Sequence, residues 1–217
     1  MIQKKGTTMR ASTAKSFAVT AAAVLALAVL LTASAAPPRL QIAQTAAQDI
    51  VLSLDPAQSK VNWTLDSTLH TVHGTFHLQN GTFQFNPQTG KASGEITVLA
   101  TSGETGNSSR DEKMHKDVLQ SAKFTTVVFH PSQIEGTVAS SGPCDVKLHG
   151  VLTLHGADHE LVIPVHAEIT ASQWKGTASF PVPFIQWGLK DPSNFFLKVK
   201  PVVDVHLDLS GSLKPAS

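Results

Sequence analysis

Tyrosine is absent from the sequence, cysteine occurs once, and charged residues are few. Only 15% of the 217 residues are Asp, Glu, Lys or Arg. The single cysteine, Cys144, has no partner for an internal disulfide, so the fold must rest on its hydrophobic core. Apart from Lys147, no basic residue lies close to Cys144 in the sequence, and we interpret it as an unreactive residue beside a turn.

Catalytic and metal-binding signatures are also missing. The sequence has no nucleophile elbow, no phosphate-binding loop and no motif of paired carboxylates. His155 and His159 flank Gly156-Ala157, but they lack the spacing of a zinc protease, and the expected strand register directs them to opposite faces. We therefore expect no catalytic residues, no bound metal and no other cofactor.

Residues 1–35 have the pattern of a secretory signal peptide. Four basic residues precede an apolar run at residues 17–31, which ends in the small residues Ala33-Ser34-Ala35. The run is short for a membrane-spanning helix, although retention as an anchor is the alternative. Cleavage would leave 13 basic and 16 acidic residues, a net charge of −3. We expect an exported protein that does not bind nucleic acid.

The remainder divides into three parts. Residues 36–49 mix Pro, Ala and Gln without periodicity and are expected to form a linker. Residues 50–212 are expected to form a single β-rich domain, because apolar and polar residues alternate along most of this stretch. Residues 213–217 are left as a C-terminal tail.

The clearest hairpin signal is Asn80-Gly81, which lies between two alternating segments. A type I′ turn needs φ > 0 at both central residues, and this dipeptide tolerates that conformation. We expect a further turn at residues 86–90 and a third strand over residues 92–98. Pairing outward from Asn80-Gly81 places six residues on one apolar face, namely Val72, Gly74, Phe76, Leu78, Phe83 and Phe85.

Later segments predict more strands of the same kind. Across Gly156-Ala157 we expect Leu152 to face Leu161 and Leu148 to face Val165, with a two- or four-residue connection. The other expected strands are residues 61–65, 124–130, 174–180 and 203–209. About eight to ten strands result, and antiparallel strands of this kind close into a barrel or pair as a sandwich.

Glycines within the apolar faces favour the barrel. They mark bends in a strand or places where something approaches the backbone closely. The positions in question are Gly74, Gly94, Gly150 and Gly176. We therefore predict an all-β fold, an antiparallel β-barrel of about eight strands with one short helix.

The helix is expected over residues 108–119. Ser109 and Glu112 form a capping box, which places the first helical residue at Arg110. Arg110 and Asp111 lie at the helix start, with His115 one turn later. Two interpretations stay open: a surface ion pair of little energetic value, or a polar mouth where Arg110 meets a ligand head group.

Strand parity predicts which side chains point into the barrel. His70 has the parity of Val72 and Phe76, and an interior histidine needs a polar partner, a water or a ligand atom. A core histidine satisfied by the protein and a ligand contact are both compatible with this position. The residues expected to line a ligand site are Trp63, His70, Phe76, Leu78, Phe83, Phe85, Ile96, Arg110, Leu152, Leu161, Ile163 and Phe180.

Five groups of residues occur together in a characteristic order. They are Gly74-Thr75-Phe76 with Asn80-Gly81, Ser109-Arg110-Asp111 with Met114 and Leu119, residues 124–131, residues 150–156, and Trp187-Gly188-Leu189. Over about residues 50–212 the chain thereby resembles the YceI-like family. Arg110 and Asp111 match that family's Arg-Asp-x-His-Leu motif, whereas His115 stands further along than the family's histidine.

The resemblance implies a lipocalin-like barrel in the periplasm or secreted from the cell. It also implies that the protein sequesters or carries a long apolar lipid, such as a polyisoprenoid or an isoprenoid quinone, and is not an enzyme. Transient membrane contact and a homodimer are left open. So are two other functions, an enzyme that acts on a lipid or a bound metal, and a packed barrel that serves as an interaction module.

Overall fold

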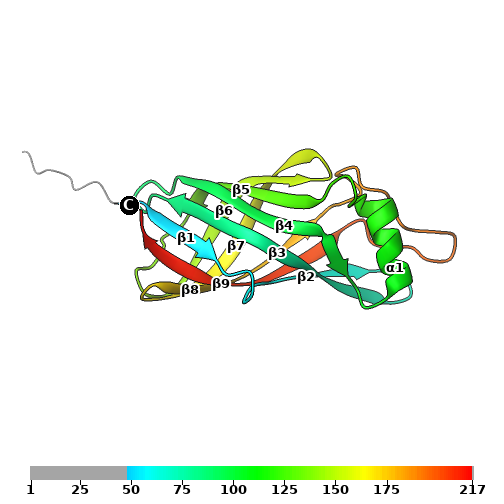
Figure 1. Cartoon of the computed structure of the whole chain (residues 1–217), viewed down its shortest axis with the longest axis horizontal. Coiled ribbons are helices and arrows are strands. Elements are labelled where there is room, and N and C mark those ends of the chain that lie inside the picture. The colour runs from blue at the N-terminus through cyan, green and yellow to red at the C-terminus, as the bar shows by residue number, and fades with distance from the viewer. Residues whose placement is uncertain (1–47, 217) are drawn as a thin grey trace, which may run out of the picture. The chain divides into compact units, whose positions relative to one another are not determined.

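The strands form one antiparallel sheet that closes on itself, as the sequence predicted (Figure 1). The computed structural model describes residues 48–216. Closure comes from the pairing of β3 with β4, while β1 and β2 occupy one position in turn between β3 and β9. The barrel therefore has eight strand positions. The strands are β1 (Ile50–Leu54), β2 (Lys60–Asp66), β3 (Thr71–Phe85), β4 (Ala92–Glu104), β5 (Thr126–Glu135), β6 (Gly142–Leu154), β7 (Ala157–Thr170), β8 (Gln173–Val182) and β9 (Val203–Pro215).

The described residues begin close to the expected domain boundary. Strand β1 starts at Ile50, and β9 continues to Pro215, so residues 213–215 belong to the barrel and not to a tail. The expected signal peptide at 1–35 and most of the linker at 36–49 lie outside the described residues. Within the described part, no helix is long and apolar enough to cross a membrane.

The hairpin predicted at Asn80-Gly81 is wrong. Strand β3 runs unbroken through both residues and pairs with β4, reached through the turn predicted at residues 86–90. Leu78 lies opposite Val98 and Asn80 opposite Thr97, so one extra residue stands between them in a β-bulge. Neither residue has positive φ, so the dipeptide stays extended in the strand.

The bulge nevertheless preserves the predicted apolar face. In an unbroken strand Leu78 and Phe83 would point to opposite sides, because their separation is odd. The extra residue reverses the parity, and both side chains are buried inside the barrel. The face was thus predicted correctly from an incorrect local structure.

The tight turn lies instead at His155-Gly156, between β6 and β7. Both residues have positive φ, 54° and 79°, as a type I′ turn requires. Leu154 pairs with Ala157, which places Leu152 opposite His159 and Leu148 opposite Ile163. The connection has two residues, one of the predicted lengths, but the predicted partners were wrong by two positions. An even shift keeps the leucines on the inner face.

The protein's own aromatic rings cover several of the glycines on the inner face. The Trp63 indole lies on Gly74 so closely that a Cβ there would come within 2.2 Å of it. The Phe129 ring covers Gly150 in the same way, at 2.4 Å from that Cβ position. The close approach predicted at these glycines is therefore made by side chains of the barrel itself.

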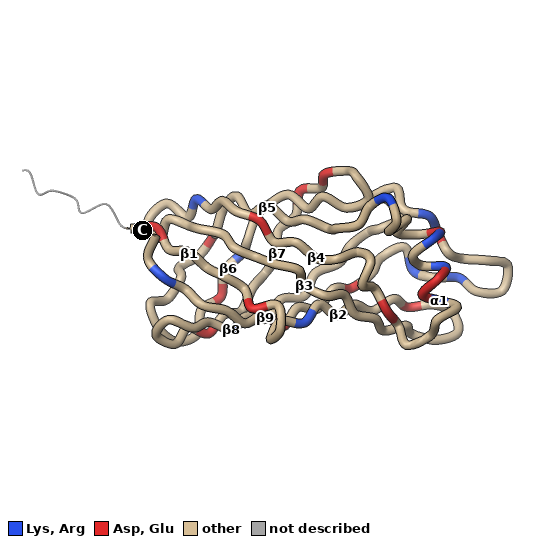
Figure 2. Tube along the Cα trace, viewed as in Figure 1, with Lys and Arg blue, Asp and Glu red and all other residues tan. Residues whose placement is uncertain are grey.

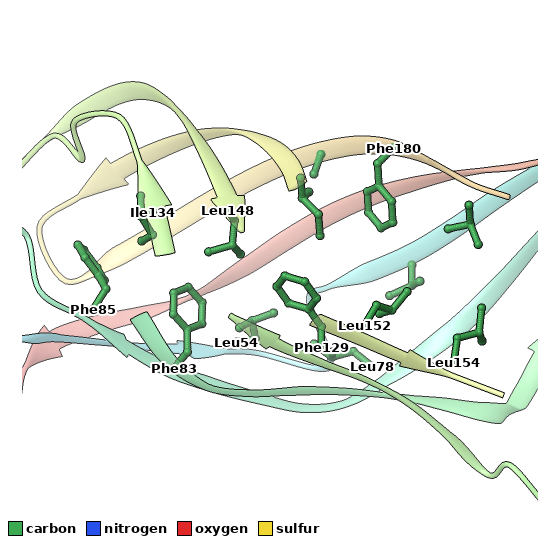
Figure 3. Close-up of a cluster of buried hydrophobic side chains, with 14 of the residues drawn as sticks. Leu54, Leu78, Phe83, Phe85, Phe129, Ile134, Leu148, Leu152, Leu154 and Phe180 are labelled. Atoms are coloured by element: carbon green, nitrogen blue, oxygen red, sulfur yellow. The ribbon is translucent and has the colours of Figure 1, made fainter. Parts of the chain in front are cut away.

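The hydrophobic core follows the barrel axis. In Figure 3, Leu148 and Phe180 point toward Phe83 and Phe129, which extend from the facing side. All four belong to one cluster of buried apolar residues that draws on most of the strands. Strand β8 shows the pattern most plainly, since its residues alternate strictly between exposed and buried.

Substitutions at the two turn candidates will separate the bulge from a hairpin. We expect His155→Val to lower the free energy of unfolding by about 1–2 kcal/mol, because β-branched residues are strained at positive φ. Asn80→Val should change it by less than about 0.5 kcal/mol, since the position is an exposed strand residue. Urea unfolding measures both, and His155→Asn controls for the lost ring. A large loss from Asn80→Val would restore the hairpin at Asn80-Gly81.

Candidate functional site

The expected ligand-lining residues largely converge inside the barrel. Six of them belong to the buried cluster: Leu78, Phe83, Phe85, Leu152, Ile163 and Phe180. Phe76, Ile96 and Leu161 are partly buried and pack against that cluster. Trp63 is also buried, with its ring centroid 6.3 Å from that of Phe76. The barrel therefore brings ten of the twelve residues to one continuous apolar interior.

The interior residues are buried but keep a small solvent-accessible fraction. Among the described residues no large side chain is less than 2% exposed, and most of the buried core lies between 5% and 9%. A close-packed protein interior normally leaves large core side chains without solvent-accessible surface. These residues thus keep a small accessible fraction although their side chains point inward.

His70 does not take the inward position expected of it. It is exposed in the connection between β2 and β3, where its backbone N–H and C=O both bond to the Ser67 hydroxyl, at 3.2 and 2.6 Å. Strand parity does not extend through this connection, so counting back from Val72 gave the wrong side. His70 is not part of the interior.

His159 occupies the interior in its place. It shares the inward parity of Leu161 and Ile163 on β7, and its imidazole stacks on Trp187 with the ring centroids 4.1 Å apart and the planes at 5°. The sequence already indicated an inward position for His159, because the predicted hairpin gave it the same strand parity as the inward leucines. Trp187 could not be placed, since it lies in the irregular β8–β9 connection.

Several polar atoms of the interior and its rim lack hydrogen-bond partners. In the described residues they are Trp63 Nε1, Trp174 Nε1, His155 Nε2 and His159 Nε2, all shielded from solvent. Leaving a buried polar group unpaired costs about 1–3 kcal/mol. Such groups are rare in native proteins unless a water or a ligand meets them.

The helix begins earlier than its sequence predicted and changes type midway. Asn107 is the N-cap and its Oδ1 accepts a hydrogen bond from the Arg110 N–H at 3.0 Å, so the predicted Ser109–Glu112 capping box is wrong. Asparagine is as favourable an N-cap residue as serine. Asn107 comes before Ser109 in the chain, so the helix already begins at Ser108. The helix continues as α1 (Ser108–Lys113) and then η1 (Met114–Leu119), a π-helical turn. Such turns are uncommon and often lie at functional sites.

The polar residues of the helix fasten it to the loop that follows β4. Asp111 Oδ1 accepts hydrogen bonds from the backbone N–H and the hydroxyl of Thr105. Arg110 donates from Nε to the Thr105 hydroxyl oxygen at 2.8 Å and from Nη2 to the Thr105 carbonyl oxygen at 3.1 Å. Both side chains thus converge on Thr105 and do not form the surface ion pair that was one interpretation.

His115 adds a second attachment one turn later. Its two ring nitrogens lie 2.8 Å from the Ser121 hydroxyl and 2.8 Å from the Gly103 carbonyl oxygen. The ring therefore bridges the end of β4 and the segment that leads into β5. The clamp formed by Arg110, Asp111, His115 and Thr105 holds the helix at one end of the barrel.

The antiparallel order determines what else lies at this end. The β2–β3, β4–β5, β6–β7 and β8–β9 connections must lie at one end and the β3–β4, β5–β6 and β7–β8 connections at the other, while the β1–β2 connection lies part-way along the wall. We call the first the mouth end; it carries α1, the His155-Gly156 turn and Trp187 (Figure 1). His159 lies two residues from the start of β7, so its imidazole is close to this end.

A surface pocket near the mouth end has a different character. Its cavity volume is about 450 Å³, and it is lined by Trp63, Gly74 and a ring of mostly polar residues. That ring consists of Asn62, Thr64, His73, Thr75, Glu104, Thr105, Gly106 and His206. Most of these side chains belong to the outer faces of β2, β3 and β9, so the pocket is distinct from the apolar interior.

The described residues contain no group of three or more His, Cys, Asp or Glu side chains suited to a metal ion. His155 packs on Phe124, with the ring centroids 4.2 Å apart, whereas His159 packs on Trp187. The two imidazoles are thus engaged with different partners. The expected absence of a bound metal stays a prediction for metal analysis of the purified protein.

Comparison with known proteins agrees with this architecture. A model of the YceI-like domain matches residues 52–211. The chain belongs to the YceI-like family. Relatives include UPF0312 proteins of Pseudomonas savastanoi pv. phaseolicola and Pseudomonas syringae pv. syringae, each 30% identical over 129 residues. The matched part is 57% of this chain and 64% of each relative, just under two thirds of their length.

Solved structures share the YceI-like barrel at low sequence identity. BcnA of Burkholderia cenocepacia has a TM-score of 0.58 and 17% identity, over 72% of this chain and 98% of that one. A polyisoprenoid binding domain from Saccharophagus degradans has a TM-score of 0.57 and 14% identity, over 75% and 98%. The YceI protein of Campylobacter jejuni has a TM-score of 0.52 and 15% identity, over 67% and 86%. These similarities establish a common fold.

The helix clamp can be tested at Thr105. We expect Thr105→Val to lower the free energy of unfolding by about 1–3 kcal/mol, because it leaves Asp111 and Arg110 without a shared hydroxyl. Thr101→Val, at an exposed position on β4 four residues before Thr105, should change it by less than about 0.5 kcal/mol. Urea denaturation of the two variants measures the difference. Equal effects would mean that the clamp does not hold the helix.

Proposed function

We propose that the protein binds one long apolar lipid, a polyisoprenoid or isoprenoid quinone, inside the barrel and carries or sequesters it outside the cytoplasm. The role is binding, without catalysis. The proposal rests chiefly on one observation: a closed barrel whose inward side chains form one apolar cluster along its length. A barrel of about eight strands is wide enough either to be filled by side chains or to hold one small ligand.

The shape and chemistry of the interior suit a chain-like ligand. The buried residues follow the barrel axis from Phe85 near one end to Leu154 near the other (Figure 3). Each buried CH₂ group contributes about 0.8 kcal/mol, so a few isoprene units offset an association cost of roughly 4–15 kcal/mol. Affinity then needs no specific polar contact along the chain.

Polar groups close to the mouth end suit the head group of such a ligand. The His159 imidazole carries a shielded nitrogen without a partner, and it faces the interior near this end. Trp63 supplies an unpaired indole N–H near the same end. A hydroxyl, carbonyl or phosphate oxygen can accept from the indole N–H, and a hydroxyl can pair with the imidazole nitrogen in either tautomer. We therefore place the head group toward the helix and the apolar tail toward Phe85.

Two further considerations support the proposal. The Saccharophagus degradans domain with this fold is itself named as polyisoprenoid binding. The apolar run and small-residue site in residues 1–35 support export, which would place the barrel in the periplasm or outside the cell. An enzyme is disfavoured because Cys144 and His159, two reactive side chains with inward parity on the described strands, lie eight residues apart along the β6–β7 pairing and cannot act together.

Lipid extraction tests the function directly. We expect the full chain, exported by its own N-terminal segment and purified without detergent, to yield a long apolar lipid on organic extraction and mass spectrometry. Removing the lipid should lower the melting temperature, because a ligand that binds only the folded state stabilises it. A protein that yields no lipid and takes up neither an isoprenoid nor a quinone when offered would refute the proposal.

A blocked interior provides the matched test. Ala178 is buried on the inner face of β8 and Ser179 beside it is exposed. We expect Ala178→Phe to reduce the bound lipid at least about tenfold, because the ring occupies the space of several CH₂ groups. Ser179→Phe should leave it unchanged. Melting curves of the lipid-free variants show whether each has folded, and equal lipid contents in two folded variants would place the lipid outside the barrel.

A further inference from the structure

Exposed large apolar side chains gather at the mouth end. The described residues include four that stand out: Leu69, 71% exposed, Phe195, 89%, Phe196, 83%, and Val162, 46%. The first three lie in the β2–β3 and β8–β9 connections, both at the mouth end, and we call them the apolar tip. Val162 stands alone on the outer face of β7. Single exposed apolar residues are ordinary, whereas a cluster of large ones marks an interaction site.

The turn that carries the two phenylalanines is well ordered by its own hydrogen bonds. The Asn194 N–H donates to the Leu197 carbonyl oxygen at 2.8 Å, and Asn194 Oδ1 accepts from the N–H groups of Phe196 and Leu197, both at 2.9 Å. Phe195 and Phe196 therefore occupy the two central positions of a tight turn. Such positions usually hold Gly, Pro, Asn, Asp or Ser. Two phenylalanines there contribute nothing to the core and are presented outward.

The two loops of the tip are fastened to each other. The Thr68 N–H donates to the Lys198 carbonyl oxygen at 2.9 Å, and Ser67 pairs with Val199 in a β-bridge. Below them Lys200 Nζ lies 2.7 Å from a carboxylate oxygen of Asp66. The hydrogen bond from Lys200, with that from Thr71, holds the pKa of Asp66 below its ordinary value, which keeps the pair charged. Leu69 and the phenylalanine pair are thus held on one connected platform.

Basic residues flank the tip. The segment 190–200 carries Lys190, Lys198 and Lys200 against a single acidic residue, Asp191. Figure 2 shows Lys and Arg gathered at this end of the barrel, interspersed with Asp and Glu. Lysines can lay their aliphatic stems along an apolar surface while their ammonium groups reach phosphate. Aromatic side chains bordered by lysine are suited to the boundary between lipid head groups and acyl chains.

We propose that the apolar tip docks the barrel, mouth first, on the surface of a phospholipid bilayer. Leu69, Phe195 and Phe196 enter the boundary between head groups and acyl chains. Lys198, which has no ion pair among the described residues, meets lipid phosphates, since Lys190 and Lys200 are paired with Asp117 and Asp66. The identity of the lipid that would pass through the mouth rests on the proposed function, whereas the docking itself does not. A long apolar lipid resides in a bilayer, and a mouth held against the surface would let its chain pass without crossing water.

Flotation with vesicles tests the docking. We expect the exported protein, which contains the whole barrel, to float with vesicles of phosphatidylcholine and phosphatidylglycerol. The double substitution Phe195→Ser and Phe196→Ser should lower the partition coefficient about tenfold or more, since two large apolar side chains lose their burial. Val162→Ser is the matched control, because it removes an exposed apolar side chain away from the mouth end. Its partition coefficient should stay within about twofold of the unsubstituted protein.

Two results would overturn the proposal. One is equal flotation of the double variant and the unsubstituted protein. The other is a dimer, detected by sedimentation velocity, that the double variant loses, because the tip would then bind a second copy of the chain. Both variants change exposed residues only. Melting curves that match that of the unsubstituted protein will show that each variant is folded.

A transfer experiment separates docking from ligand binding. We expect a fluorescent isoprenoid to move from vesicles to the double variant about tenfold more slowly than to the unsubstituted protein, while equilibrium binding of a water-soluble short isoprenoid is unchanged. Equal transfer rates would refute the docking. If neither protein binds an isoprenoid but only the unsubstituted one floats, the proposed function fails and the docking stands.

Discussion

The alternation of side chains along closed strands is the constraint on which the rest of the structure depends. In a closed antiparallel sheet every second residue points inward, so a register error of one position would expose a whole apolar row. The one extra residue beside Asn80 is tolerated because it restores parity over a fifteen-residue strand. Aromatic rings on Gly74 and Gly150 then fill the places where the wall carries no side chain. The bulge and the rings over the two glycines together keep the interior apolar.

The two ends of the barrel differ because polar chemistry is concentrated at one of them. At the mouth end the Thr105 clamp fixes the helix, and the Lys200–Asp66 pair ties two long connections together. The opposite end is closed by short turns such as that at residues 86–90, where the Asn86 side chain accepts bonds from two backbone N–H groups. The mouth end, whose β4–β5 and β8–β9 connections are long, is therefore the end that we propose for ligand entry.

Much of the barrel was predictable because alternation is a local signal. The antiparallel fold, most of the strands and the inward position of ten of the twelve residues expected to line a site follow from residue parity. The errors arose where the outcome depends on contacts distant in sequence. Asn80-Gly81 has the composition of a turn, but pairing with β4 keeps it extended. His70 lies beyond the end of its strand, and the choice of Asn107 over Ser109 as cap depends on how the loop arrives.

The site residues that sequence reasoning missed share a physical cause. His159 is inward by parity, yet its importance comes from the stacking of Trp187, which a twenty-residue connection brings back to the mouth end. Phe195 and Phe196 likewise have no strand pattern, and their exposure results from the Asn194 turn. A segment without periodicity carries no information on which way its side chains point. The functional character of this barrel therefore lies mainly in its least regular connections, positioned by a framework that is itself highly regular.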